Sequence, residues 1–238
     1  SLLLFHFSLF WRLDMNTTTK TLSALAGLAM IAGSADAALL SVDLGSTTNV
    51  QTDFTGVASS SDTIGDYDFS LGTVAFFNRN NMDDAGSLTT ATLYEDFAYI
   101  NGGGGGSGSP KSTSLVLSGA GIAENTAYQL TFYSFDPVGS AGTHTVSFSG
   151  SAGTTGSAAN IVWTGSTNPT TDGQYATTGT FTSDGSGVLT VTVSDSWTGA
   201  TDVTGLRLNG FVLDVPEPGS LALLGLGGLL IGARRRRG

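Results

Sequence analysis

Short runs in which apolar and polar residues alternate constrain this chain more than any other feature. Leu189, Val191 and Val193 would lie on one side of an extended segment, and Thr190 and Thr192 on the other. Similar runs recur between residues 39 and 213, and turn-forming Asp-Gly pairs separate some of them. No segment between residues 38 and 214 has the spacing of an amphipathic helix. The pattern therefore predicts an all-β domain.

The number of such runs predicts a jelly-roll-like β-sandwich of about eight to ten strands. The chain's 34 glycines and its 12% of charged residues are typical of β-rich extracellular modules with many turns. It contains no cysteine, which excludes thiol chemistry, but a domain of this length can bury a sufficient core without disulfides. The expected strands are Leu39–Leu44, Thr73–Phe77, Ala91–Ile100, Ser114–Leu117, Tyr128–Phe135, His144–Phe148, Asn160–Trp163, Tyr175–Thr182, Val188–Val193 and Gly205–Leu213.

The predicted domain, residues 38–214, is strongly acidic, with three basic residues against sixteen acidic ones and a net charge of −13. Nucleic acid is excluded as a partner, because phosphate binding needs a basic surface. Solubility is one explanation of the excess. The other is a structural calcium ion, since loops carrying hard carboxylate oxygens are what calcium prefers. The candidate ligands, which cluster in one polar stretch, are Asp62, Asp66 and Asp68.

The N-terminal residues have the features of an export signal. Residues 1–14 precede Met15, and we expect them to be upstream over-translation, or else a longer start of the signal. Lys20 then supplies a positive charge, residues 22–32 form an apolar stretch, and Ala35 and Ala37 give the small residues that signal peptidase reads. Residues 15–37 are therefore predicted to be a signal peptide forming a signal helix. The alternative is a buried N-terminal helix.

The last 24 residues, 215–238, combine three features. Pro216, Glu217 and Pro218 favour an extended backbone, because proline cannot continue a strand or a helix interior. An apolar run of 13 residues, 221–233, follows, shorter than the roughly 20 that cross a bilayer unaided. It predicts a short hydrophobic helix and a transient anchor in the inner membrane, with the basic end on the cytoplasmic side. Its large apolar residues are Leu221, Leu223, Leu224, Leu226, Leu229, Leu230 and Ile231, and its basic stop is Arg234, Arg235, Arg236 and Arg237.

These three features, in this order, resemble the PEP-CTERM sorting signal of Gram-negative and related bacteria. The resemblance implies that the membrane enzyme exosortase recognises the tail and cleaves near Pro216, Glu217 and Pro218. These three residues would be recognition elements, because the nucleophile belongs to exosortase. The implied route runs through the secretion machinery to the cell envelope, the surface or the extracellular matrix. The alternative is a plain C-terminal anchor that is never processed.

The segment Gly119–Asp136 resembles the loop and strand of galactose-binding-like jelly rolls, and Leu93–Phe97 and Leu206–Leu213 are similar to their flanking strands. This resemblance implies a β-sandwich that binds glycans or serves as a structural accessory. The partner would be an exopolysaccharide or another glycan. The aromatic residues expected near loop or strand ends, where a ring could stack on a sugar, are Trp163, Tyr175 and Trp197. The alternative is that these rings belong to the core.

The predicted domain shows no recognisable catalytic constellation. Its single histidine, His144, shares a strand face with Val146 and Phe148, which predicts a position at the edge of the core. Glu95 and Asp96 are adjacent, so on a strand they would point to opposite faces. We therefore expect a non-enzymatic surface or matrix protein with a structural or adhesive role. The alternatives are a carbohydrate-binding module and a glycan-active enzyme with carboxylates that converge in space.

Overall fold

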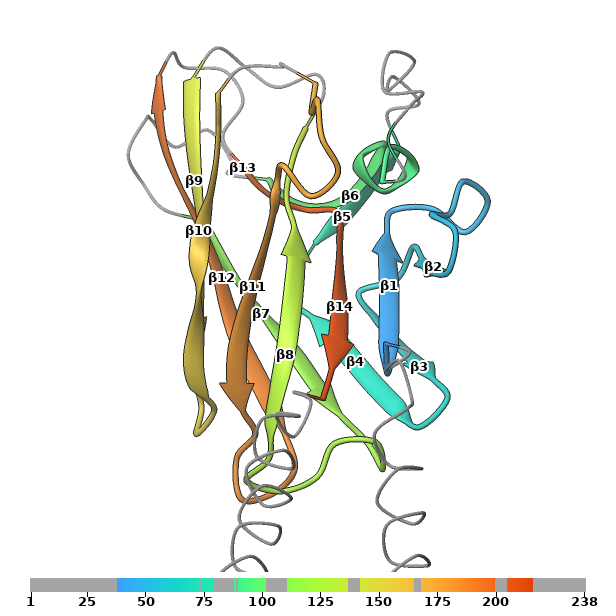
Figure 1. The fold of residues 1–238 in the computed structure, drawn as a ribbon, viewed down its shortest axis with the longest axis vertical. Coiled ribbons are helices and arrows are strands. Elements are labelled where there is room, and N and C mark those ends of the chain that lie inside the picture. Colours follow the sequence, from blue (N-terminus) through green and yellow to red (C-terminus); the bar gives the residue numbers. More distant parts are fainter. Residues whose placement is uncertain are drawn as a thin grey trace, which may run out of the picture. The chain divides into compact units, whose positions relative to one another are not determined.

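The protein is described by a computed structural model of residues 38–72, 74–78, 88, 90–101, 111–136, 142–164, 168–199 and 205–215. These residues form fourteen strands and one 3-10 helix, with no α-helix among them (Figure 1). The all-β prediction is confirmed. The predicted signal helix, the C-terminal hydrophobic helix and the Pro-Glu-Pro motif lie outside the described residues.

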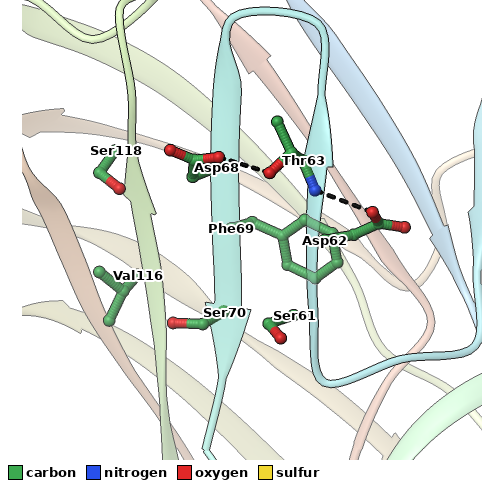
Figure 2. Close-up of a pocket in the computed structure, with 8 residues that line it drawn as sticks. All are labelled: Ser61, Asp62, Thr63, Asp68, Phe69, Ser70, Val116 and Ser118. Carbon is green, nitrogen blue, oxygen red and sulfur yellow. Dashed lines mark hydrogen bonds between the residues drawn. The ribbon is translucent and has the colours of Figure 1, made fainter.

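The larger sheet has eleven strands in the order β2-β1-β14-β8-β11-β10-β9-β12-β7-β4-β3. One edge is the hairpin of β3 and β4, which Figure 2 shows beside β7. The strands are β1 (Leu40–Leu44), β2 (Thr55–Val57), β3 (Ser61–Ile64), β4 (Tyr67–Leu71), β7 (Lys111–Ser118), β8 (Ala127–Tyr133), β9 (Gly142–Gly150), β10 (Thr155–Thr164), β11 (Ala176–Thr182), β12 (Leu189–Gly199) and β14 (Gly210–Asp214).

The smaller sheet has three antiparallel strands in the order β13-β6-β5, namely β13 (Gly205–Leu208), β6 (Asp96–Asn101) and β5 (Ala75–Asn78). The 3-10 helix η1 (Thr92–Tyr94) leads directly into β6. The prediction of one strand over Ala91–Ile100 is therefore wrong in its first half. Leu93 and Tyr94 are buried, as an apolar run predicts. The run alone, however, does not distinguish a helical turn from a strand.

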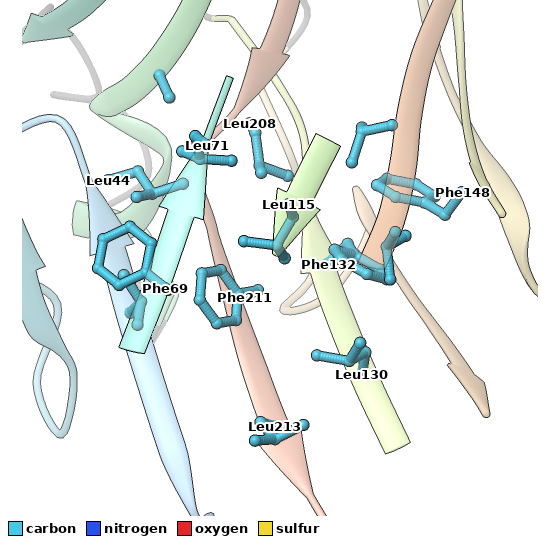
Figure 3. Close-up of a cluster of buried hydrophobic side chains, with 14 of the residues drawn as sticks. Leu44, Phe69, Leu71, Leu115, Leu130, Phe132, Phe148, Leu208, Phe211 and Leu213 are labelled. Carbon is cyan, nitrogen blue, oxygen red and sulfur yellow. The ribbon is translucent and has the colours of Figure 1, made fainter. Parts of the chain in front are cut away.

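The large sheet folds over on itself to enclose the core. Phe132 on β8 and Phe148 on β9 stack with ring centroids 4.3 Å apart, although β11 and β10 lie between their strands. In a flat sheet three strand spacings would separate them by roughly 14 Å. A register irregularity between Ala158 and Ile161 of β10 lies within the bend. The result is a β-sandwich-like fold, whose core is shown in Figure 3. There the ring centroids of Phe69 on β4 and Phe211 on β14 lie 6.1 Å apart.

The described residues hold more strands than the eight to ten predicted. The strands β2, β3 and β4 are short additions, and the exposed polar residues of β3 gave no alternating signal. The predicted strand Gly205–Leu213 is two strands, because the chain changes sheet at Asn209. This buried side chain satisfies the backbone at the crossing: its Oδ1 accepts from the N–H of Phe135 at 2.6 Å, and its Nδ2 donates to the carbonyl of Asp96 at 2.8 Å.

Candidate functional site

The predicted sorting tail, residues 215–238, follows a strand that is paired on both sides. β14 lies between β1 and β8, with Leu213 opposite Leu40 and also opposite Leu130. The last described residue, Val215, is 42% exposed. The segment that follows therefore continues from a strand held by two ladders of hydrogen bonds. Among the described residues, no helix has the length and apolar character needed to cross a membrane.

A row of buried rings crosses three neighbouring strands of the large sheet. Trp163 on β10 and Trp197 on β12 both lie directly opposite His144 on β9, and opposed residues of antiparallel strands share a face. The His144 ring stacks on Trp163 with centroids 3.9 Å apart and an angle of 10°. His144 is fully buried, together with Val146 and Phe148, as the alternation predicted.

His144 forms a buried hydrogen bond with a residue of the next strand. Its Nδ1 lies 2.7 Å from Oδ2 of Asp195, and both side chains are in the core. A carboxylate at Nδ1 is the arrangement that orients a catalytic histidine. Here, however, Nε2 is buried without a hydrogen-bond partner among the described residues. The pair is a structural element of the core.

A buried ion pair joins the two sheets. Nε of Arg207, on β13, donates to Oδ2 of Asp136, just after β8, at 2.8 Å, and Nη1 donates to the carbonyl of Gly205 at 2.7 Å. The guanidinium lies 5.3 Å from the Tyr99 ring centroid and 5.6 Å from that of Trp163. Neither Arg207 nor Asp136 is exposed. Charge, hydrogen bonds and cation–π contacts therefore act together at this junction.

The three aromatic residues expected to stack on a sugar lie in the core. Trp163 is 2% exposed, and Tyr175 and Trp197 are each 6% exposed. Tyr175 stacks on Phe135 at 4.6 Å with an angle of 5°. This is the core alternative that we considered from the sequence. A sugar needs an exposed ring face, so the prediction of glycan binding at these positions has no structural support.

The aspartates expected to bind calcium do not converge. Asp62 on β3 lies opposite Phe69 and Asp68 on β4 lies opposite Thr63, so their side chains occupy opposite faces of the hairpin (Figure 2). Asp68 Oδ1 accepts from the Thr63 hydroxyl at 2.6 Å. Asp66 lies in the exposed turn between the strands. Nowhere in the described part of the chain do three Asp, Glu or His side chains meet as a metal site of that size would require.

The outer face of this hairpin carries a shallow polar depression of about 500 Å³ (Figure 2). Its position follows from the register, because Ser70 lies opposite both Ser61 and Val116, and Asp68 lies opposite both Thr63 and Ser118. The residues around the depression are Ser61, Asp62, Thr63, Asp68, Phe69, Ser70, Val116 and Ser118, of which Asp62 and Phe69 hold positions of the opposite face in the register. The serine hydroxyl groups that line it can form hydrogen bonds with solvent or with a polar partner.

Two further carboxyl groups are buried where β1 comes close to β6. Asp43 and Asp96 are both 0% exposed. Burial raises the pKa of each carboxyl to about 7, and the negative charge of Glu95 adds to both shifts. The negative charge of Asp96 also raises the pKa of Asp43, whereas the N–H of Gln51, 2.7 Å from Asp43 Oδ2, lowers it. Ser46 lowers the pKa of Asp96, but its hydroxyl does not reach hydrogen-bond geometry with either oxygen.

Sequence reasoning missed Asp43, Asp96 and Arg207 as partners in buried charge clusters. A signal was present, because Asp43 interrupts an apolar strand and Arg207 stands between Leu206 and Leu208. A charge within an apolar strand needs a buried partner. The sequence does not say which residue that partner is.

Comparison with protein-family models matches residues 214–237 to the PEP-CTERM protein-sorting motif. No curated protein matches the chain. One solved structure that matches is the crystal structure of the Macrobrachium rosenbergii nodavirus P-domain, with 14% identity and a TM-score of 0.28. That match covers 51% of this chain and 94% of the viral one. The match at residues 214–237 supports export to the cell envelope or surface and processing by exosortase.

Proposed function

We propose that this chain is an exported protein of the cell surface or extracellular matrix with a structural or adhesive, non-enzymatic role. In this proposal exosortase processes it at Pro216, Glu217 and Pro218 after the apolar run has held it transiently at the inner membrane. The observation that carries the proposal is the match of residues 214–237 to the PEP-CTERM motif. The motif begins at Asp214, the last residue of β14, so it follows the domain without a spacer.

The arrangement of β14 supports a load-bearing role. A pull on the new C-terminus that processing leaves is transmitted to a strand with a hydrogen-bonded neighbour on each side, β1 and β8. Detaching such a strand along its axis requires many backbone hydrogen bonds to shear together. An edge strand, by contrast, would lose only one ladder.

The burial of the chemically reactive side chains supports a non-enzymatic role. His144, Asp43 and Asp96 are each 0% exposed, and Asp195 is 4% exposed. An acid, base or nucleophile must touch its substrate, so these groups are enclosed too deeply for catalysis in this conformation.

Fractionation of the native host tests the sorting part of the proposal. Wild-type protein should reach the surface or medium, and mass spectrometry should find its C-terminus shortened near Pro218. Replacing Pro216, Glu217 and Pro218 by alanine should leave the tail intact and the protein in the inner-membrane fraction. The matched control, Asp62→Asn with Asp68→Asn on the exposed hairpin, should behave as wild type. Normal processing of the alanine variant, or unchanged localisation after deletion of residues 215–238, would contradict the proposal.

A separate experiment tests the non-enzymatic role. The purified full chain is incubated with exopolysaccharide extracted from the same cells, and reducing ends are measured over time. We expect no release above buffer, together with loss of matrix cohesion or cell adhesion in a strain that lacks the protein. Release of new reducing ends that depends on this chain would show that it is a glycan-active enzyme.

A further inference from the structure

Three carboxyl oxygens are buried at the junction of β1 and β6 without a hydrogen-bond partner. They are Oδ1 of Asp43 and both Oδ1 and Oδ2 of Asp96. The fourth oxygen of the two groups, Oδ2 of Asp43, accepts from the N–H of Gln51 at 2.7 Å. Buried polar atoms are almost always paired, and carboxylates are among the most costly to leave unpaired. These three oxygens therefore call for a partner of positive charge.

The backbone brings the start of β6, where Asp96 lies, against the end of β1, two residues after Asp43, and the charge of Asp96 acts on Asp43. Gly45, two residues after Asp43, has a φ of +132°, and a Cβ placed on it would lie 2.7 Å from Cβ of Asp96 and 2.7 Å from the N–H nitrogen of Phe97. The start of β6 thus presses directly against the end of β1. A short loop after Gly45 is fixed by Ser46, whose hydroxyl accepts from the N–H groups of Thr48 and Asn49, each at 3.1 Å.

No positively charged side chain of the described residues fills the role of partner. Among the described residues, Arg207 pairs with Asp136 and His144 contacts Asp195, and neither the cationic nor the histidine side chain reaches Asp43 or Asp96. A third carboxyl group, Glu95, is adjacent in sequence and accepts a hydrogen bond from Nδ2 of Asn49. Among the described residues the local charge is therefore negative.

We propose that Asp43 and Asp96 together bind one calcium ion, which links the large sheet to the small one. Oxygen ligands alone favour a hard cation, whereas zinc prefers nitrogen and sulfur. Calcium takes six to eight oxygens in irregular geometry, so backbone carbonyls or water would complete the shell around the two side chains. The proposed site uses only two acidic side chains. It is therefore compatible with the finding that no group of three or more His, Cys, Asp or Glu side chains among the described residues could hold a metal ion. It also differs from the site predicted at Asp62, Asp66 and Asp68.

Calcium titration of the full chain tests the proposal. The protein is stripped with EDTA and dialysed, and binding of calcium chloride is followed by calorimetry and by thermal unfolding. We expect one ion per chain with a dissociation constant of about 10⁻⁴ to 10⁻³ M, the range of extracellular modules. Calcium at a hundredfold excess over Kd should raise the midpoint of unfolding by about 5–10 °C.

Two matched variants locate the ion. Asp43→Asn with Asp96→Asn should abolish both the binding heat and the midpoint shift, whereas Asp62→Asn with Asp68→Asn removes the same charge from the exposed hairpin and should change neither. If the first variant fails to fold, terbium luminescence of the single variant Asp96→Asn replaces it, with at least tenfold weaker terbium binding expected. Absence of calcium binding by wild type, or binding that survives at the Asp43 and Asp96 variants, would overturn the proposal. Loss of binding only in the hairpin variant would overturn it as well. The outcome is independent of tail processing, so it can fail without affecting the proposed function.

Discussion

The buried pair of Arg207 and Asp136 offers a sharp test of how the two sheets are held together. Asp136→Asn keeps the size of the side chain but removes its charge, leaving a guanidinium that is 0% exposed without its counterion. At 2.8 Å the two groups are in direct contact, and removing one partner of such a pair typically costs about 3–5 kcal/mol. The cation–π contacts with Tyr99 and Trp163 remain and reduce the loss of stability, but they do not replace the negative charge of Asp136.

We therefore expect Asp136→Asn to lower the midpoint of thermal unfolding by roughly 6–20 °C, since a domain of this size loses about 2–4 °C per kcal/mol. Circular dichroism of the full chain with urea and with heat provides the measurement. Asp62→Asn is the matched control, because it makes the same change at an exposed site, and it should shift the midpoint by no more than about 2 °C.

A double-mutant cycle separates charge from packing. The single variant Arg207→Met removes the guanidinium that pairs with Asp136 and should cost about as much as Asp136→Asn. The double variant Arg207→Met with Asp136→Leu removes both charges, so it should recover most of the lost stability. An Asp136→Asn variant as stable as the Asp62→Asn control would refute the reasoning, because the guanidinium would then need no counterion.

Three further predictions follow from burial and backbone geometry. Gly45→Ala should cost roughly 2 kcal/mol or more, because the new Cβ meets backbone and Asp96 at 2.7 Å; urea unfolding measures this, and a neutral variant would contradict it. Phe211→Ala should lower the free energy of unfolding by about 3–5 kcal/mol, whereas Val162→Ala, at a residue 54% exposed, should be close to neutral. Equal losses would contradict the burial of Phe211 in the core. In EDTA the unfolding free energy should fall as the pH rises from about 4 to about 7, because Asp43 and Asp96, with pKa values raised to about 7, hold protons more tightly in the folded state. The fall should be absent in the double variant Asp43→Asn with Asp96→Asn. A fall of equal size in that variant would show that other groups cause it.

Part of the fold follows directly from local pattern. The alternation around Val191, and that of Val146 and Phe148, is read from neighbouring residues, and each segment forms a strand with those side chains buried. Local pattern fails where the chain leaves regular pairing. Gly205–Leu213 is a largely apolar run that predicts one strand, and the change of sheet at Asn209 depends on hydrogen bonds to Phe135 and Asp96, which are far away in the sequence.

The candidate sites show the same division. Clustering in sequence suggested Asp62 and Asp68 as ligands, but paired strands place neighbouring positions on opposite faces of the hairpin. Asp43 and Asp96 have no proximity in sequence, and only the approach of β1 to β6 brings them together. Likewise, the residues next to Trp163 and Trp197 in the sequence do not indicate that these rings are buried.

The sequence by itself determined the all-β class and the sorting motif, because strand alternation and a linear recognition tail are both written in consecutive residues. The tertiary structure alone decided which charges meet in the core, which rings are covered, and that β14 is held between β1 and β8. These features depend on contacts between distant segments, whose pairing is set by the packing of the whole core rather than by any local stretch of chain.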